Sequence, residues 1–173
     1  MTLIVRPESA LDYPVVAAIH RVAFGGGGEV NLVAAVRQSE NYIPALSLVA
    51  VLDEQVVGHI LFSRCHIQGA ERTVPALALA PLAMLPAYQN QAVGTALMWE
   101  GLNACRQKRH EIVIVLGHPD YYTRFGFVPA STAGIHAPFP LEDDAAFMAQ
   151  GLTPGVLDGV SGMVQYPPHF DGV

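Results

Sequence analysis

Charged side chains are scarce in this sequence. They make up 14% of the 173 residues, against roughly 25% in an average soluble domain. Lysine and arginine together number 9 and aspartate and glutamate 15, which leaves a net charge of −6 at pH 7. Because nucleic-acid binders normally carry a basic stripe, this balance argues against nucleic acid as the partner. The hydrophobic fraction of 51% also excludes a chain that is disordered throughout.

Cysteine and long apolar runs are scarce as well. The two cysteines, Cys65 and Cys105, show no CxxC and no metal-ligand spacing, so we expect two free thiols in a cytoplasmic protein. The most apolar stretch, residues 76–86, contains prolines and is far shorter than the ~20 residues that cross a membrane. The start of the chain does not have the charge order of a signal peptide. We therefore expect no membrane association.

Sequence motifs for metals and dinucleotides are missing. The seven histidines are scattered, and none forms an HxH or HExxH spacing, so no metal site is expected. Among them, only His118 is a candidate for lining a site, because it ends an apolar strand beside Tyr122. No GxGxxG follows the first apolar run, which disfavours a dinucleotide-binding fold.

The patterns that are present predict an α/β domain. Short apolar runs predict strands at residues 3–5, 47–52, 56–67, 73–85, 112–116 and 160–166, with a further strand starting at Phe127. Residues 47–52 and 56–67 are expected to form an antiparallel hairpin. Helical spacing predicts one helix from Ser9 to the four glycines at 25–28, a second around residues 32–36 and a third from 93 to about 108. Pro81 cannot donate to a ladder, so it predicts a bulge or a splayed strand.

The first segment that could carry chemistry is residues 80–97. An apolar strand leads through a loop of small and polar residues into a helix. The first N–H groups of such a helix have no acceptor within it, and the helix dipole adds about half a positive charge there, so the end attracts phosphate. Thr95 can add a hydroxyl donor. The same pattern also fits a plain loop entering an amphipathic helix, because Gly94 is the only glycine of the loop.

The second segment, residues 117–127, follows an apolar strand and contains two adjacent tyrosines, Tyr121 and Tyr122. A phenol, with a pKa of about 10, is well matched to protonating an alkyl thiolate that leaves in a reaction. Both tyrosines are equally compatible with a packing role.

Together and in this order, the two segments resemble the Gcn5-related N-acetyltransferase (GNAT) family. Residues 81–97 are similar to its acetyl-CoA motif, in which an apolar strand is followed by Q/R-x-x-G-x-G/A and a helix. Residues 121–127 are similar to its second motif, a tyrosine four residues before Gly-Phe. The resemblance covers about residues 3–130, and the tail is similar to short bacterial predicted N-acetyltransferases. It implies a single domain over 1–173, with its core at about 3–130 and a C-terminal extension at 131–173.

The resemblance also implies a fold and a cosubstrate. The fold is a mixed, mostly antiparallel sheet of six or seven strands, splayed between two parallel central strands, with helices on both faces. The cosubstrate is acetyl-CoA, whose pantetheine arm would meet the main chain of Leu82, Ala83 and Met84. Its pyrophosphate would lie against the loop and first helical turn formed by Gln89, Asn90, Gln91, Ala92, Val93, Gly94, Thr95 and Ala96.

Three loop positions depart from the family pattern. The family has Gly where this chain has Asn90, Arg or Lys where it has Gln91, and Gly where it has Ala92. Because of these departures, a second function stays an alternative. It is that of a non-catalytic acyl-CoA or small-ligand binding protein with a degenerate GNAT pyrophosphate loop.

By the same resemblance, the acceptor is a primary amine of a small molecule or a protein, and it attacks acetyl-CoA directly. Tyr122 would protonate the departing CoA thiolate. Glu29, which follows the glycines, is the candidate for contacting or deprotonating the amine. It also fits a carboxylate that is favoured at a helix start by the dipole alone. The terminal strand at 160–166 is a candidate contact for a homodimer.

Overall fold

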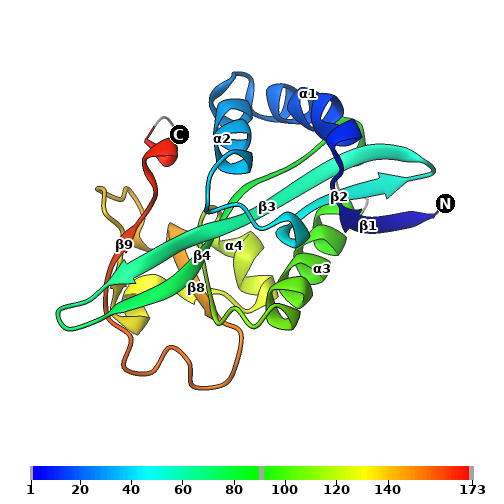
Figure 1. Ribbon diagram of the computed structural model, residues 1–173. Coiled ribbons are helices and arrows are strands. Elements are labelled where there is room, and N and C mark those ends of the chain that lie inside the picture. Colours follow the sequence, from blue (N-terminus) through cyan, green and yellow to red (C-terminus); the bar gives the residue numbers. More distant parts are fainter. Residues whose placement is uncertain (1, 90–91, 172–173) are drawn as a thin grey trace. The chain divides into compact units, whose positions relative to one another are not determined.

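Nine strands and four α-helices make up the mixed α/β fold of the computed structural model, which describes residues 2–89 and 92–171 (Figure 1). The helices are α1 (Tyr13–Phe24), α2 (Gly28–Arg37), α3 (Val93–Gln107) and α4 (Pro119–Tyr122). The strands are β1 (Leu3–Pro7), β2 (Ser47–Leu52), β3 (Gln55–Gln68), β4 (Thr73–Met84), β5 (Ile112–Leu116), β6 (Val128–Pro129), β7 (Ile135–His136), β8 (Phe147–Gly151) and β9 (Gly162–Gln165).

The strands pair in the order β1-β2-β3-β4-β5-β8-β6, and β9 pairs with β3 and β7. The pairs β1·β2, β2·β3, β5·β8, β6·β8 and β3·β9 are antiparallel. Strands β4 and β5 are parallel, with Leu77 opposite Val113 and Ala78 opposite Ile114. The predicted mixed, mostly antiparallel sheet with two parallel central strands is confirmed, but the described residues form nine strands rather than the six or seven expected.

The chain divides into two compact units. The first consists of Met1–Ser63, Ala80–Ala104 and Pro168–Val173, and the second of Arg64–Leu79 and Cys105–Pro167. Strands β3 and β4 and helix α3 therefore each contribute to both units. In residues 2–89 and 92–171, no helix has the length and apolar character needed to cross a membrane.

In the first unit, helices cover both faces of β3. Side chains alternate between the faces of a strand, and Ile60 and Phe62 lie beside Gly101 of α3. On the opposite face, Leu61 belongs to a buried cluster with α2. The α2 residues of this cluster are Leu32, Val33 and Val36. The apolar spacing that predicted this helix therefore also identified the face that it buries.

Backbone geometry explains where the first unit turns. Helix α1 ends at Gly25, whose φ of 72° is easily reached only without a Cβ. The turn between β2 and β3 places Asp53 and Glu54 at φ of 49° and 70°. Aspartate tolerates this left-handed region better than most residues. The predicted helix stop and the predicted hairpin are both confirmed.

In the second unit, β5 pairs with β8 over five residue pairs, from Ile112–Gly151 to Leu116–Phe147. Neither β8 nor the short β7 was expected from the sequence. Only Phe147–Ala149 of β8 forms an apolar run, and acidic residues precede it. The strand is buried because β5 and β6 both pair with it, a long-range cause that short-range patterning does not reveal.

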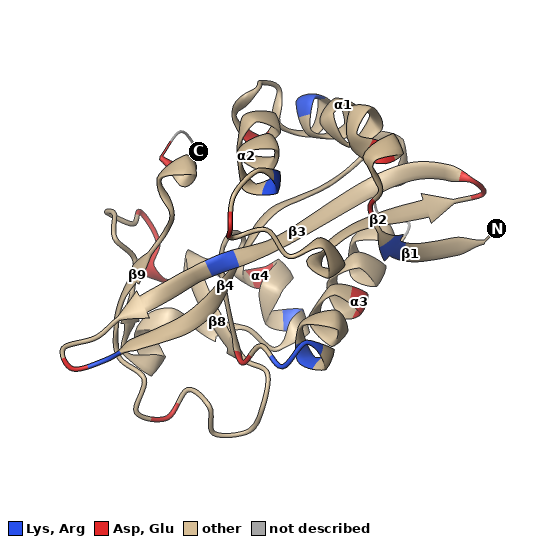
Figure 2. Cartoon of the chain, in the orientation of Figure 1, with Lys and Arg blue, Asp and Glu red and all other residues tan. Residues whose placement is uncertain are grey.

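The strand around Pro81 is continuous from Thr73 to Met84. Its parallel pairing with β5 covers two residue pairs, both ahead of Pro81. Strands β2, β4, β5 and β8 contain no Asp, Glu, Lys or Arg, whereas β3 contains Arg64 (Figure 2). Basic residues also mark the end of α3 and the loop after it, where Arg106, Lys108 and Arg109 suit the negative end of the helix dipole.

Candidate functional site

Gly58 of β3 allows the start of α3 to lie close to the end of β4. A Cβ built on Gly58 would lie 3.0 Å from Leu97 Cδ1, 3.1 Å from Val93 Cγ1 and 3.3 Å from the Ala83 carbonyl oxygen. Real Cβ atoms rarely come this close to their neighbours, so the packing favours glycine. Two segments expected to hold acetyl-CoA, around Ala83 and around Val93, are thereby brought together.

The backbone immediately before α3 has a left-handed turn. Ala92 has a φ of 65°, and its carbonyl accepts the first helical hydrogen bond, 2.9 Å from the Ala96 nitrogen. The N–H groups between these residues have no acceptor within the helix, so the start of α3 can receive an anion such as a phosphate. The price is strain at Ala92 of about 1–2 kcal/mol, because a Cβ disfavours this φ.

The other expected cosubstrate residues flank this turn. Leu82 and Met84 lie on β4 and are half-buried, whereas Gln89 follows a short 3-10 turn at Pro86–Tyr88. Gly94, Thr95 and Ala96 form the first turn of α3, as the loop-to-helix pattern predicted. Asn90 and Gln91 were also expected to contact the pyrophosphate, and they lie outside the described residues.

Tyr122 ends α4 in the second unit and packs against Gly117. A Cβ on Gly117 would overlap the Tyr122 ring, so glycine is required for this arrangement. The ring also makes edge-on contacts with Tyr121 at 5.1 Å and Phe127 at 5.8 Å between centroids. Burial, with a smaller contribution from Tyr121, raises the pKa of Tyr122 to about 12. The phenol therefore remains protonated at neutral pH and is available as a proton donor.

Tyr121 differs from its neighbour in the surroundings of its hydroxyl. The hydroxyl is buried and has no hydrogen-bond partner within the described part of the chain. Burial raises the pKa of this phenol, while the Arg124 guanidinium, 5.2 Å from the ring centroid, lowers it. Both phenols are partly buried, and the geometry within this unit does not separate a donor from a packing residue.

His118 contributes its main chain to this segment. Its carbonyl accepts hydrogen bonds from the backbone nitrogens of Tyr121 and Tyr122, at 3.1 and 3.2 Å. A role for its side chain in a site stays a prediction. Glu29 lies in the first turn of α2 and is half-buried. Its role toward an amine likewise stays a prediction.

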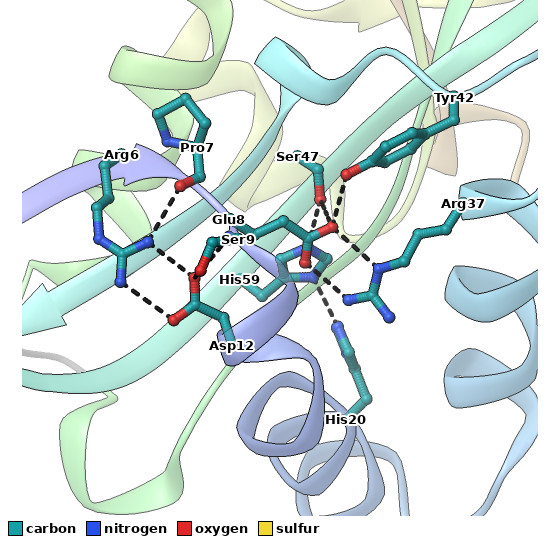
Figure 3. Close-up of polar contacts among 10 residues, drawn as sticks. All are labelled: Arg6, Pro7, Glu8, Ser9, Asp12, His20, Arg37, Tyr42, Ser47 and His59. Atoms are coloured by element: carbon teal, nitrogen blue, oxygen red, sulfur yellow. Dashed lines mark hydrogen bonds and ion pairs between the residues drawn. The ribbon is translucent and has the colours of Figure 1, made fainter.

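The sequence did not predict a buried polar network in the first unit (Figure 3). At its centre is Glu8, whose side chain has no exposed surface. Arg37 donates two hydrogen bonds to the carboxylate, from Nε at 3.0 Å and Nη2 at 2.7 Å. Tyr42 and Ser47 donate their hydroxyls to it at 2.9 and 2.7 Å. Four donors therefore compensate one buried negative charge.

Two histidines extend this network. His59 Nε2 lies 2.9 Å from Ser47 Oγ, and His59 Nδ1 lies 2.8 Å from His20 Nε2. Both histidines are fully buried. Burial and the Arg37 charge lower the pKa of His20 to about 4, and burial lowers that of His59 well below its usual value. Both rings are therefore neutral at pH 7.

A weak signal for the histidine pair does exist in the sequence. His20 follows Val16 by four residues and so lies on the apolar face of its helix, while His59 interrupts an apolar strand between Gly58 and Ile60. A polar residue on a buried face needs a partner. The signal does not say that the two residues are partners of each other. Within the described residues, no group of three or more His, Cys, Asp or Glu is placed to hold a metal.

Comparison with known proteins identifies the family. A family model described as an acetyltransferase (GNAT) domain matches residues 5–130. The chain belongs to the GNAT family of acetyltransferases, as its motifs indicated.

Particular relatives agree with this assignment. The chain is 42% identical over 134 residues to the uncharacterized N-acetyltransferase YjhQ of Escherichia coli K12, covering 76% of this chain and 74% of that protein. It is 34% identical over 170 residues to the uncharacterized N-acetyltransferase YhbS of the same strain, covering 98% and 99%.

Two solved structures are similar over nearly the whole chain. A crystal structure of Escherichia coli YhbS in complex with CoA has a TM-score of 0.89 and 32% identity, and the match covers 97% of this chain and 91% of that one. A GNAT family acetyltransferase from Brucella melitensis in complex with acetyl-CoA has a TM-score of 0.78 and 31% identity, covering 98% and 99%. These neighbours support acetyl-CoA as the expected cosubstrate.

Proposed function

We propose that this protein transfers the acetyl group of acetyl-CoA to a primary amine of a small molecule or a protein. The observation that carries the proposal is the close approach of the end of β4 to the start of α3 at Gly58. There the main chain at the end of β4 lies beside the N–H groups that begin α3. The first suits the amides of the pantetheine arm of an acyl-CoA, and the second suits its pyrophosphate. The CoA and acetyl-CoA complexes of the two similar structures support the same choice.

Acetyl-CoA would lie along these two segments. The main chain of Leu82, Ala83 and Met84 would bond the amides of the pantetheine arm. The pyrophosphate would lie at the start of α3, where the N–H groups of the first turn can donate to its oxygens. Gln89 and the residues up to Ala96 would surround it. The roles of Asn90 and Gln91 are inferred from the sequence alone.

The reaction would proceed by direct attack. The neutral amine nitrogen bonds to the thioester carbonyl carbon and then loses one of its protons to solvent, and collapse of the tetrahedral intermediate breaks the C–S bond. Tyr122 donates its phenolic proton to the departing thiolate, and solvent reprotonates the phenolate later. The raised pKa of Tyr122, caused by burial, keeps that proton in place until the thiolate forms.

Glu29 would meet the amine before the reaction. An amine is cationic at neutral pH, and a half-buried carboxylate at the start of α2 can hold that charge. The role proposed for Glu29 is therefore contact with the ammonium group or its deprotonation. The overall charge of −6 also favours the approach of a cationic acceptor.

The alternative is a protein that binds acyl-CoA without turning it over. The specific observation in its favour is Ala92, which adopts a φ of 65° where the family pattern has glycine. Calorimetric titration with acetyl-CoA, followed by measurement of thiol release with a pool of primary amines, separates the two functions. Binding with amine-dependent thiol release supports the transferase. Binding without release supports the alternative, and absence of binding overturns both.

A further inference from the structure

The direction of every hydrogen bond in the buried network follows from Glu8. An ionised carboxylate only accepts hydrogen bonds, so each neighbour must donate to it. Ser47 therefore donates its single hydroxyl proton to Glu8, 2.7 Å away. Toward His59, 2.9 Å away, the Ser47 oxygen can then only accept. The proton on His59 consequently lies on Nε2, which is also the nitrogen 3.6 Å from Glu8 Oε1.

The same reasoning assigns the tautomer of His20. A neutral imidazole with a proton on Nε2 has a bare Nδ1. His59 Nδ1 must then accept, so the proton of the 2.8 Å contact comes from His20 Nε2. The remaining nitrogen, His20 Nδ1, is left unprotonated. The three hydrogen bonds all point the same way, from His20 through His59 and Ser47 to Glu8.

His20 Nδ1 is where the network ends without a partner. The residue has no exposed surface, and Nδ1 has no hydrogen-bond partner in the described part of the chain. Leaving a buried acceptor unpaired costs roughly 1–3 kcal/mol. The side-chain polar atoms of Glu8, Ser47 and His59 all take part in hydrogen bonds. The lone pair of the chain of hydrogen bonds that has no donor is therefore on the His20 ring. A lone pair held in this way is suited to a donor that the protein itself does not supply.

We propose that His20 is the general base of the acetyl transfer, with Nδ1 accepting a proton from the ammonium group of the acceptor. The proposal rests on the proposed function. The acceptor ammonium loses one proton to Nδ1 and becomes the neutral amine that attacks acetyl-CoA. His59 and Ser47 are positioning residues, because they act on the amine only through His20.

Proton uptake at Nδ1 makes His20 an imidazolium, whose Nε2–H remains bonded to His59 Nδ1. The imidazolium gives the proton to solvent after the product leaves. Of the charged groups facing the rings, Glu8 favours the protonated form of His20, whereas Arg37 opposes it.

Phe24 is the aromatic neighbour of His20 on α1. The two rings stack with centroids 5.9 Å apart and planes at 17°. Phe24 is 46% exposed. For the acceptor to reach Nδ1, the Phe24 side chain must rotate away from the His20 ring.

The test compares two amines that differ in basicity. Ethylamine is almost fully protonated at pH 7 and needs a base, whereas 2,2,2-trifluoroethylamine is largely neutral. In His20→Gln, a side-chain amide can still donate to His59 but cannot act as a base. We expect kcat/KM to fall about 100-fold with ethylamine, the usual scale of general base catalysis, and less than about threefold with trifluoroethylamine.

Three controls accompany the comparison. His66→Gln changes an exposed histidine of the same strand as His59 and should leave both rates unchanged. Glu29→Gln tests the competing base, and an ethylamine-selective loss in this variant with none in His20→Gln would overturn the proposal. Acetyl-CoA affinity and the unfolding temperature of His20→Gln should match those of the unmodified protein.

The remaining outcomes are equally decisive. Equal losses with both amines, or no loss with either, would overturn the role of His20 alone. Absence of turnover with every amine would overturn the proposed function and this role with it. Nitrogen-15 NMR reads the tautomer independently of turnover. Nδ1 of His20 should be unprotonated at pH 7, and a proton found on it would overturn the proposal.

Discussion

Arg37 and Glu8 form a two-point ion pair inside the first unit. The Arg37 Nε and Nη2 atoms lie 3.0 and 2.7 Å from the two carboxylate oxygens of Glu8. The Glu8 side chain has no exposed surface, and that of Arg37 is 13% exposed. The pair therefore joins α2 to the end of β1 across 29 residues of sequence. Removing one partner would leave the other charge buried and unpaired.

This pair predicts a large loss of stability in Arg37→Met. Methionine retains much of the side-chain volume but leaves the Glu8 carboxylate without its cation, at a cost of about 3–5 kcal/mol. Arg6→Met is the matched control, because the Arg6 side chain is 42% exposed in its pair with Asp12 and such pairs contribute at most about 1 kcal/mol. Urea unfolding at pH 7 measures both. Similar losses in the two variants would contradict the structural role of the buried pair.

The histidine pair predicts a pH dependence of folding. Burial and Arg37 lower the pKa of His20 in the folded protein from 6.5 to about 4. The unfolded chain binds this proton near pH 6.5 and the folded chain does not, so acid favours unfolding. The contribution of His20 to the free energy of unfolding should be flat above pH 7 and fall by roughly 3 kcal/mol between pH 6.5 and 4, since one pKa unit corresponds to about 1.4 kcal/mol.

Urea titrations at several pH values measure this slope, and His20→Gln should reduce it. Asp12 acts in a different window, because its hydrogen bonds with Arg6 lower its pKa from 3.8 to about 2. Its contribution is present above pH 4 and disappears as the pH falls toward 2. A slope between pH 6.5 and 4 that is unchanged in His20→Gln would mean that other groups cause it.

Ala92 predicts a stabilising substitution. Its φ of 65° strains an alanine but not a glycine, so Ala92→Gly should stabilise the fold by about 1 kcal/mol. The relaxed turn should also strengthen acetyl-CoA binding in calorimetry. Ala96→Gly, inside the first turn of α3, is the control and should destabilise by about 0.5–1 kcal/mol. Loss of stability in Ala92→Gly would show that alanine is not strained at this turn.

Tyr122 and Tyr121 predict unequal effects on turnover. Tyr122→Phe removes the phenolic proton and keeps the ring against Gly117, so kcat should fall about 100-fold while acetyl-CoA affinity and stability stay the same. Tyr121→Phe should change kcat little. Adjacent helical residues point about 100° apart and cannot share one position. Steady-state kinetics measures both, and equal small effects would return Tyr122 to a packing role.

Local patterns predicted most of the first unit. The run ending at Pro7, the β2–β3 hairpin and the three longer helices all depend on nearby residues, such as the Gly25 stop. Strand β8 was missed because its burial depends on pairing with β5, which lies more than thirty residues earlier in the chain. Sequence periodicity has no access to such a partner.

The candidate site shows the same division. The loop-to-helix pattern identified the start of α3 from Gly94 and its neighbours, whereas the role that the family motif implies for Tyr122 stays a prediction. The close approach at Gly58 was not predicted, because the neighbours of a glycine in a strand are set by packing. The contact between His20 and His59 joins residues 39 positions apart, and no motif relates them.

Transfer of a labelled acetyl group distinguishes direct acetylation of an amine from hydrolysis and from an acetylated enzyme. Acetyl-CoA carrying carbon-13 in its acetyl carbonyl is mixed with excess enzyme, first alone and then with ethylamine, and the products are read by mass spectrometry and NMR. We expect the label as an amide on the amine nitrogen, CoA released in equal amount, and no labelled protein before the amine is added. Label recovered as free acetate, or on the protein in the absence of amine, would contradict direct transfer to an amine.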